Sequence, residues 1–327
     1  MTALNDRVRS IMSNHSMEWE QSETIAWRKA ETYRASGDLW TAAELECFAG
    51  YALFCGRPAE IAEHFPRAIQ LAERVGHLDA LFVAKHLSVV LSIARGDLSS
   101  AERELEDTRN FADAHNGAWN FVLDPHCAEV AFLRGNFREA GRWFSGRTEP
   151  RTFFFGWSDA ALFAILAESK DDRAWKAWTD RLWKFPRTGE LNSAGDWNAL
   201  ERSVIGLASM GKNDEAAALR PLTEELVKTE PWTGYSLLPF RTAAGIAAAC
   251  AGDWSAAESH HLTAIHQADT APYRTAQPMT REWYAAMLLE RGETAKARGL
   301  LSEALTMYES MGMAFHSKRA SEKLAKL

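Results

Sequence analysis

Apolar residues recur along the chain with the spacing of helices. They lie three or four positions apart over long stretches, as at Ala297, Leu301 and Ala304, and this spacing places them on one face of a helix. Apolar and polar residues nowhere alternate over a convincing length, so the pattern predicts no strand. The chain is therefore expected to be all-α.

A turn signal separates the predicted helices at a regular interval of about forty residues. A glycine is followed, five positions later, by an alanine; these glycines are Gly96, Gly135, Gly211, Gly252 and Gly292. Residues 170–174 fill the one longer gap with a degenerate copy, and Gly56 begins an earlier copy. Each unit predicts two antiparallel helices joined at the glycine. Such a pair must stack on neighbouring pairs to bury its apolar face.

The residues around these glycines resemble the second half of a tetratricopeptide repeat. The matching positions are Gly252, Trp254, Ala257 and Ala264 in one copy and Gly135, Phe137, Ala140 and Phe144 in another. The resemblance extends from about residue 38 to the end of the chain. The long period is similar to that of the arrays at the C-terminal ends of bacterial signalling ATPases, including maltose-regulator-type and cyclase-linked proteins. The resemblance implies binding of a ligand or protein in the groove of a superhelix, and no particular chemistry.

We therefore expect a right-handed α-solenoid of tetratricopeptide-like antiparallel helix pairs. It forms one domain over residues 19–327, ends in a capping helix, and follows a flexible tail at residues 1–18. The expected helices cover residues 19–35, 38–54, 57–75, 78–95, 97–115, 119–134, 136–145, 157–169, 171–184, 194–210, 213–229, 234–251, 253–269, 276–291, 293–311 and 313–326.

Composition narrows the classes of partner. The 327 residues include 44 acidic and 37 basic side chains, for a net charge of -7, and the basic ones form no cluster of the kind that binds nucleic acid. The longest apolar runs, such as residues 243–251, are too short to span a bilayer, and residues 1–20 have no apolar signal core. A cytoplasmic location without a membrane or nucleic-acid partner is expected. The four cysteines have no metal-ligand spacing, so we expect neither disulfides, nor a metal, nor a cofactor.

Charged residues recur eleven positions before the repeat glycines or their Lys170 substitute. Aligned in this way, the positions form a row in which Leu200 is the one uncharged member; the charged members are Lys85, Asp124, Asp159, Arg241 and Arg281. Small residues such as Cys127, eight positions before the glycine, leave room beside the row. The row lines a groove, or it lies outward in solvent, or its acids and bases pair between neighbouring repeats.

Aromatic residues suggest a second kind of site. Six of the thirteen tryptophans fall within residues 143–197, where the repeat is least regular. Clustered tryptophans form the floor of a ligand pocket or fill a core. The pocket hypothesis includes Trp157, Trp197, Tyr235 and Tyr284, whereas the helical spacing of Trp175 and Trp178 favours packing.

Signs of catalysis are weak. Residues 206–213 resemble a phosphate loop but lack its Ser/Thr and follow a helix instead of a strand. His260, His261 and His266 have no spacing that places two imidazoles together on one helix face. If the chain is an enzyme on a helical-repeat frame, Asp124, His126 and Asp159 are the acid/base candidates.

The sequence therefore favours a non-catalytic scaffold that binds a peptide or protein partner in its concave groove. Arg241 and Arg281 would bind acidic groups there, and Asp124 and Asp159 would bind a basic group. A small-molecule sensor with a Trp-rich pocket is the alternative, and an enzyme is the third hypothesis.

Overall fold

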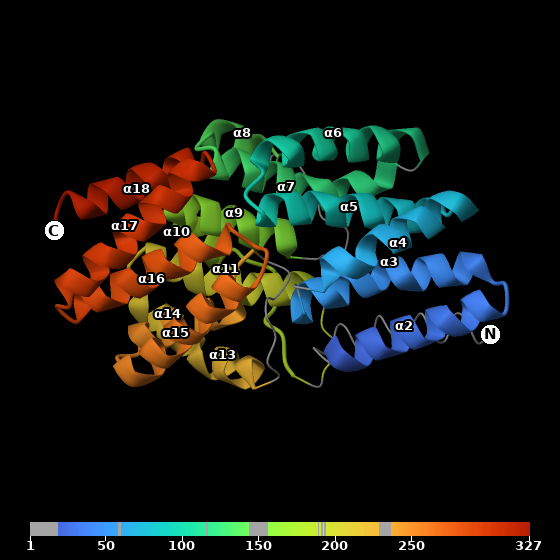
Figure 1. Cartoon of the computed structure of the whole chain (residues 1–327). Helices are drawn as coiled ribbons and strands as arrows, with labels where there is room; N and C mark the ends of the chain where they lie inside the picture. Colours follow the sequence, from blue (N-terminus) through green and yellow to red (C-terminus); the bar gives the residue numbers. More distant parts are fainter. Residues whose placement is uncertain are drawn as a thin grey trace.

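The regular secondary structure of the described residues is entirely helical. The computed structural model describes residues 19–57, 60–115, 117–143, 156–188, 190, 192, 194–228 and 237–327. Within these ranges it has seventeen α-helices, one 3-10 turn and no strand, which confirms the expected all-α class (Figure 1). The expected tail at residues 1–18 lies outside the described residues.

Most of the helices follow one another with short connections, whereas longer segments separate α8 from α9, α10 from α11 and α13 from α14. Their bounds are α2 (Trp19–Ala35), α3 (Leu39–Gly56), α4 (Ile61–Val75), α5 (Leu78–Ala94), α6 (Leu98–His115), the 3-10 turn η1 (Gly117–Trp119), α7 (Asn120–Leu133), α8 (Phe137–Arg142), α9 (Trp157–Glu168), α10 (Ala174–Thr179), α11 (Ala194–Ser209), α12 (Asn213–Ala218), α13 (Arg220–Val227), α14 (Phe240–Cys250), α15 (Trp254–Thr270), α16 (Ala276–Glu290), α17 (Thr294–Ser310) and α18 (Ala314–Leu324).

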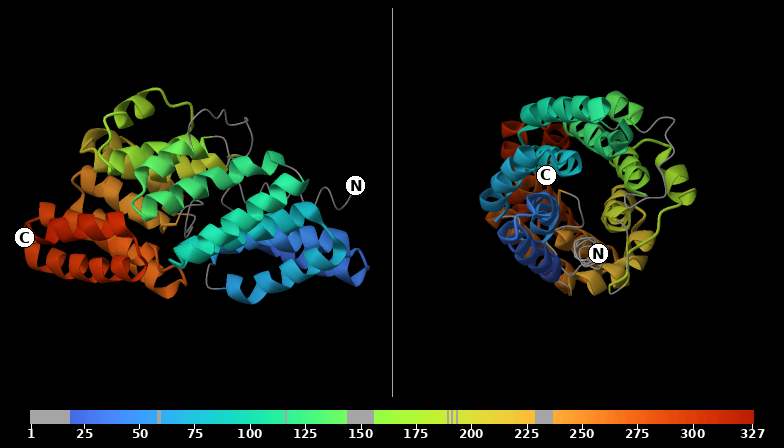
Figure 2. Two further views of the ribbon diagram at one scale, coloured as in Figure 1. Left: turned by 90° about the horizontal axis from the view of Figure 1, so that it is seen from above. Right: turned by 90° about the vertical axis from the view of Figure 1, so that its right-hand side faces the viewer.

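Burial divides these helices into two kinds. The core-layer helices α5, α7, α9, α14 and α16 are buried on several sides, as Phe82 and Ile93 of α5 illustrate. The outer helices α6, α15 and α17 bury one stripe at helical spacing, such as Leu98, Ala101 and Leu105 in α6. A helix with a single apolar stripe presents its other face to water. Seen end on, the helices surround a common axis (Figure 2).

Glycine turns and small residues set how closely the helices approach. Gly96 has φ +74°, a left-handed conformation that ends α5. The Asp97 carboxylate then accepts a hydrogen bond from the Ser100 N–H at 3.0 Å and caps α6. The alanines five positions after the repeat glycines are all fully buried; they are Ala101, Ala140, Ala216, Ala257 and Ala297.

The C-terminal helices return to the middle of the chain. The Thr275 N–H and Oγ1 both donate to the Ala94 carbonyl oxygen, at 3.0 and 2.9 Å. Met311 packs on Gly96 so closely that a Cβ on this glycine would lie 2.2 Å from the Met311 Sδ atom. These contacts join the end of α5 to the turns before α16 and after α17.

A buried ionic cluster also joins the C-terminal helix α18 to α9 and α16. Arg319 of α18 forms ion pairs with Glu168 of α9 at 2.6 Å and with Glu282 of α16 at 2.7 Å. Glu282 also accepts hydrogen bonds from Tyr308 at 2.8 Å and Lys323 at 2.9 Å. Burial favours the neutral form of Glu282, but the charges of Arg319 and Lys323 outweigh it and hold the pKa of this carboxyl well below its usual range. We refer to Arg319, Glu168, Glu282, Tyr308 and Lys323 as the closing cluster.

Several expected helices differ in the structure. The helix expected from residue 234 begins at Phe240 of α14, and the described residues 237–239 before it are not helical. The helix expected from residue 57 begins at Ile61 of α4. The segment expected over residues 213–229 is divided into α12 and α13, because Pro221 in the first turn of α13 has no N–H to continue the helix. The segment expected over residues 171–184 is reduced to α10, since Trp183 leaves helical geometry to pack against Trp178. The helix expected from residue 119 begins after a 3-10 turn.

Candidate functional site

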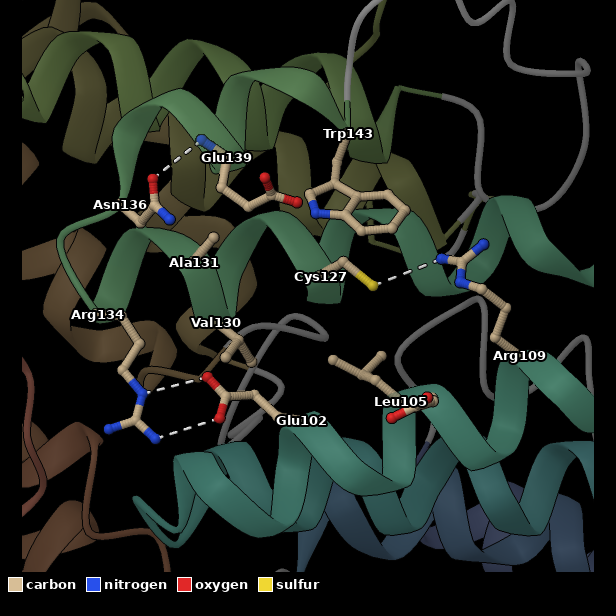
Figure 3. Close-up of a pocket in the computed structure, with 11 residues that line it drawn as sticks. Glu102, Leu105, Arg109, Cys127, Val130, Ala131, Arg134, Asn136, Glu139 and Trp143 are labelled. Atoms are coloured by element: carbon tan, nitrogen blue, oxygen red, sulfur yellow. Dashed lines mark hydrogen bonds and ion pairs between the residues drawn. The ribbon is translucent and has the colours of Figure 1, made fainter.

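A cleft of about 370 Å³ lies between the outer helix α6, the core-layer helix α7 and the short helix α8. Its floor comes from α7 and from Leu105 of α6, and its walls come from other residues of α6 and from α8 with Trp143 just after it (Figure 3). We call it the α6–α8 cleft; its lining residues are Glu102, Leu105, Glu106, Arg109, Cys127, Val130, Ala131, Arg134, Asn136, Glu139 and Trp143.

The sequence of α7 creates the space for this cleft. Cys127, Ala131 and Arg134 are spaced by four and three residues, so they share one face of the helix with Asp124. The first two are small and leave a hollow between the neighbouring helices. The Asn136 side chain accepts a hydrogen bond from the Glu139 N–H at 3.2 Å, caps α8 and so fixes the wall opposite α6.

The floor of the cleft is apolar. Leu105, Val130 and Ala131 contribute side chains that are 6%, 3% and 8% exposed. Trp143 forms the upper wall, and the Arg109 guanidinium carbon lies 4.7 Å from the centre of its ring. An apolar floor with an aromatic wall suits a hydrophobic group of a ligand.

Most charges at the rim are already paired. Arg109 donates to the Asp124 Oδ1 at 2.8 Å. Arg134 donates to the two carboxylate oxygens of Glu102 at 3.3 and 3.4 Å, as Figure 3 shows. Glu139 accepts a hydrogen bond from Arg142 at 2.9 Å. A further carboxylate, that of Glu106, is exposed and has no hydrogen bond or ion pair with the described residues.

Cys127 is the one thiol of the cleft. The Arg109 Nη2 lies 3.5 Å from its sulfur, but burial dominates and raises the pKa of the thiol. Cys127 is therefore protonated at neutral pH, and its environment does not activate it as a nucleophile.

Two members of the predicted row of charged residues, Lys85 and Asp124, face the outer helix α6. Lys85 of α5 lies with its Nζ 5.6 Å from the centre of the Phe111 ring on α6. Asp124 of α7 pairs with Arg109, which is also on α6. Asp159 is exposed at the start of α9, and desolvation of its carboxyl raises its pKa.

The two arginines of the row, Arg241 and Arg281, also contact side chains of neighbouring helices. The Arg241 Nη1 lies 3.3 Å from the His260 Nδ1 on α15. Arg281 of α16 is 8% exposed and pairs with Asp269 of α15 at 2.8 Å and with Glu303 of α17 at 3.0 Å. Arg281 and Asp124 thus have the pairing between neighbouring units that the sequence left open as an alternative.

The aromatic residues of the pocket hypothesis lie in different surroundings. Trp197 is fully buried, and Trp157, 6% exposed, packs edge-on against His126 at 5.7 Å between ring centres. Tyr284 donates to the Glu258 Oε1 at 2.9 Å, and burial together with this carboxylate raises its pKa to about 12. Tyr235 lies outside the described residues.

Two of the residues considered for catalysis, His126 and Gly206, lie in packed surroundings. The His126 Nδ1 lies 3.8 Å from a Glu129 oxygen, beneath the buried His86 ring at 4.9 Å between centres. Gly206, the first residue of the phosphate-loop resemblance, lies inside α11, where a Cβ would be 2.4 Å from the Phe163 ring. Gly206 therefore allows the close packing of the Phe163 ring against α11.

Sequence reasoning missed the buried ion pairs. Glu129 of α7 pairs with Arg202 of α11. Burial favours the neutral carboxyl, but Arg202 outweighs it and lowers the pKa of Glu129 to about 2. The sequence does offer one signal of such a pair, since Glu129 is a charged residue on the largely apolar helix α7. The partner is 73 positions away, so no local pattern identifies it.

No protein-family model and no curated protein matches this chain. Among the described helices none is both long and apolar enough to cross a membrane. The described residues also contain no group of three His, Cys, Asp or Glu side chains arranged to hold a metal ion.

Proposed function

We propose that the chain is a right-handed α-solenoid of tetratricopeptide-like helix pairs and that it binds a peptide segment of a partner protein without catalysis. The fold part of this proposal is supported by the left-handed conformation of the five repeat glycines, Gly96, Gly135, Gly211, Gly252 and Gly292, and by the buried alanine five positions after each of these five. The alternation of core-layer and outer helices along the chain also supports it.

The α6–α8 cleft carries the binding part of the proposal. It combines an apolar floor at Leu105 and Val130, an aromatic wall at Trp143 and a charged rim. Interfaces of this kind bind a few bulky side chains deeply and leave the polar rim in water. A peptide presenting one or two large apolar side chains fits this arrangement.

The predicted row is less suited to be the contact surface. Arg281 is buried and already paired with two carboxylates, so a ligand would have to break those pairs. Arg241 lies against His260, which in turn contacts Glu224 at 3.3 Å. We therefore assign binding to the outer cleft and give the row the role of joining neighbouring units.

A small molecule is the second candidate occupant. The cleft volume of about 370 Å³ falls in the range of small-ligand sites. The sensor function is therefore the alternative that the cleft geometry also favours.

Native mass spectrometry of the gently isolated protein tests this proposal. A second protein at a defined stoichiometry is expected, and Trp143→Ala should weaken its binding at least about tenfold because an aromatic wall is lost. Trp175→Ala is the matched control. Trp175 is 38% exposed, lies outside the cleft and also has a cation over its ring, Lys212 at 4.3 Å.

The outcomes separate the candidates. Loss of the partner in Trp143→Ala alone supports the peptide-binding cleft. A retained small mass that Trp143→Ala releases supports the sensor. Equal effects of the two substitutions, or binding that neither changes, contradict a role of the cleft.

A further inference from the structure

We propose that the α6–α8 cleft selects a basic peptide, one in which a bulky apolar residue is followed or preceded closely by Lys or Arg. This inference rests on the proposed function and specifies the chemistry of the partner. The apolar residue would occupy the floor formed by Leu105, Val130 and Ala131. The cation would pair with Glu106 at the rim.

The charge balance of the rim carries this inference. Arg109 is paired with Asp124, Arg134 with Glu102, and Arg142 with Glu139. The opposite charges within each pair cancel, so the three pairs add no net charge to the rim. The Glu106 carboxylate remains without a partner among the described residues, so the cleft as a whole is negative.

An acidic partner would have to release a paired arginine. Release of Arg109 would cost stability, because it would break the ion pair of Arg109 with the Asp124 carboxylate, which is 2% exposed. Arg134 is held by Glu102 and also by the Ser99 hydroxyl at 3.0 Å. Among its described residues, the cleft thus offers the Glu106 carboxylate to a basic group of a partner, whereas both of its arginines are already paired and are not available to an acidic group.

The same charge argues against two other partner classes. Nucleic acids and anionic membranes bind through unpaired Lys and Arg side chains that contact phosphate groups. A rim with glutamates on both walls, Glu102 and Glu106 on α6 and Glu139 on α8, repels phosphate. A basic peptide is the occupant that matches both the apolar floor and the negative rim.

Three capped tripeptides test the inference. Their central residue is tryptophan, and the two flanking residues are lysine in the first, glutamine in the second and glutamate in the third. Ligand-detected NMR titrations give the dissociation constants for the full chain. The rate of Cys127 alkylation by iodoacetamide shows whether the peptide occupies the cleft, since the sulfur lines it.

We expect the lysine peptide to bind about three- to fivefold more tightly than the glutamine peptide, as one partly exposed ion pair allows. The glutamate peptide should bind most weakly. All the peptides that bind should slow alkylation of Cys127. Raising the salt concentration should shrink the preference for lysine, because exposed charges are screened.

Two matched variants assign the preference to one carboxylate. Glu106→Gln should make the lysine and glutamine peptides bind alike. Asp107→Asn changes the same charge at the adjacent exposed position of α6, outside the cleft lining, and should leave the preference intact. Both positions are exposed, so neither variant should unfold the protein.

The possible failures are distinguishable. Equal binding of the lysine and glutamine peptides with protection of Cys127 overturns the basic preference and leaves the peptide cleft standing. A lysine preference that persists in Glu106→Gln overturns the role of this carboxylate. If none of the peptides protects Cys127, both the inference and the proposed function are wrong.

Discussion

Burial holds one histidine of the outer helix α15, His261, in its neutral form. His261 of α15 is 1% exposed, and neither ring nitrogen has a hydrogen-bond partner in the described part of the chain. Its ring packs on Gly245, where a Cβ would lie 2.9 Å from it. Burial lowers the pKa of His261 to about 3, with a smaller contribution from the neighbouring His260.

This burial makes stability depend on pH. The unfolded chain protonates His261 below the usual pKa of about 6.5, whereas the folded chain resists protonation until about pH 3. The folded state is therefore fully favoured above pH 6.5 and loses stability as the pH falls toward 3.

We predict that His261→Leu raises the free energy of unfolding. Leucine occupies the equivalent positions at Leu105 and Leu301, and the substitution removes two unsatisfied polar atoms, for a gain of about 1 kcal/mol at pH 7.5. The gain should grow between pH 6.5 and pH 5, by up to roughly 1.4 kcal/mol per pH unit. Urea unfolding at both pH values measures it.

The exposed His266 on the same helix supplies the control. His266→Leu should change the stability by less than about 0.5 kcal/mol at either pH. A His261→Leu variant whose advantage stays constant from pH 7.5 to 5 would show that this histidine does not titrate as burial requires.

At the scale of elements, two glycines with nearly identical backbone φ angles allow the cost of backbone strain to be measured separately from the cost of steric crowding. Gly96 has φ +74° and Gly252 has φ +75°. A Cβ on Gly96 would meet Met311, whereas a Cβ on Gly252 would meet no atom within 4 Å. Gly252→Ala therefore carries the cost of left-handed alanine alone.

We predict that Gly252→Ala costs about 1 kcal/mol and that Gly96→Ala costs about 2 to 4 kcal/mol, since overpacking adds to the backbone strain. Thermal and urea unfolding give both values. Adding Met311→Ala should relieve Gly96→Ala more than it affects Gly252→Ala. Equal losses in the two glycine variants would mean that α17 does not press on the turn after α5.

The same turns explain how much of the helical pattern the sequence reveals. The sequence predicts a helix over residues 253–269, and the structure has α15 at Trp254–Thr270, because Gly252 and the capping residue Asp253 act locally. The division of α12 and α13 at Leu219 escapes the helical periodicity, although Pro221 is a local signal for it. Local chemistry determines where helices start and stop.

The candidate site is less predictable for a physical reason. The sequence points to Asp124 and the small residue Cys127, both on α7. Glu106 and Trp143 flank the cleft from either side of α7, and the angle between α6 and α8 brings them together. No periodicity along one helix encodes that angle, which depends on packing throughout the layer.

At the scale of the whole molecule, the closing cluster determines whether the C-terminal helices stay against the middle of the chain. We predict that Arg319→Met destabilises the protein by about 3 to 5 kcal/mol at pH 7, because Glu168 would remain buried without its cation and Glu282 would keep only Lys323. Urea unfolding measures the loss.

The sign of its pH dependence follows from Glu282. The lowered pKa of this carboxyl adds stability above its usual value of about 4.5, and that stability is lost as the pH falls further. The difference between the wild-type protein and Arg319→Met should therefore shrink at pH 3.5. Lys318→Met, which removes an exposed partner of Glu322 in the same helix, is the control and should have little effect.

The central claim is that the α6–α8 cleft contacts a partner protein, and site-specific photo-crosslinking tests it most directly. A benzophenone side chain placed at Glu106 lines the cleft, and one at Asp107 does not. In an extract of the cells that make this protein, we predict that one defined protein is crosslinked from position 106, and that Trp143→Ala abolishes the product. Crosslinks of equal pattern from positions 106 and 107, or none from position 106, would contradict the claim.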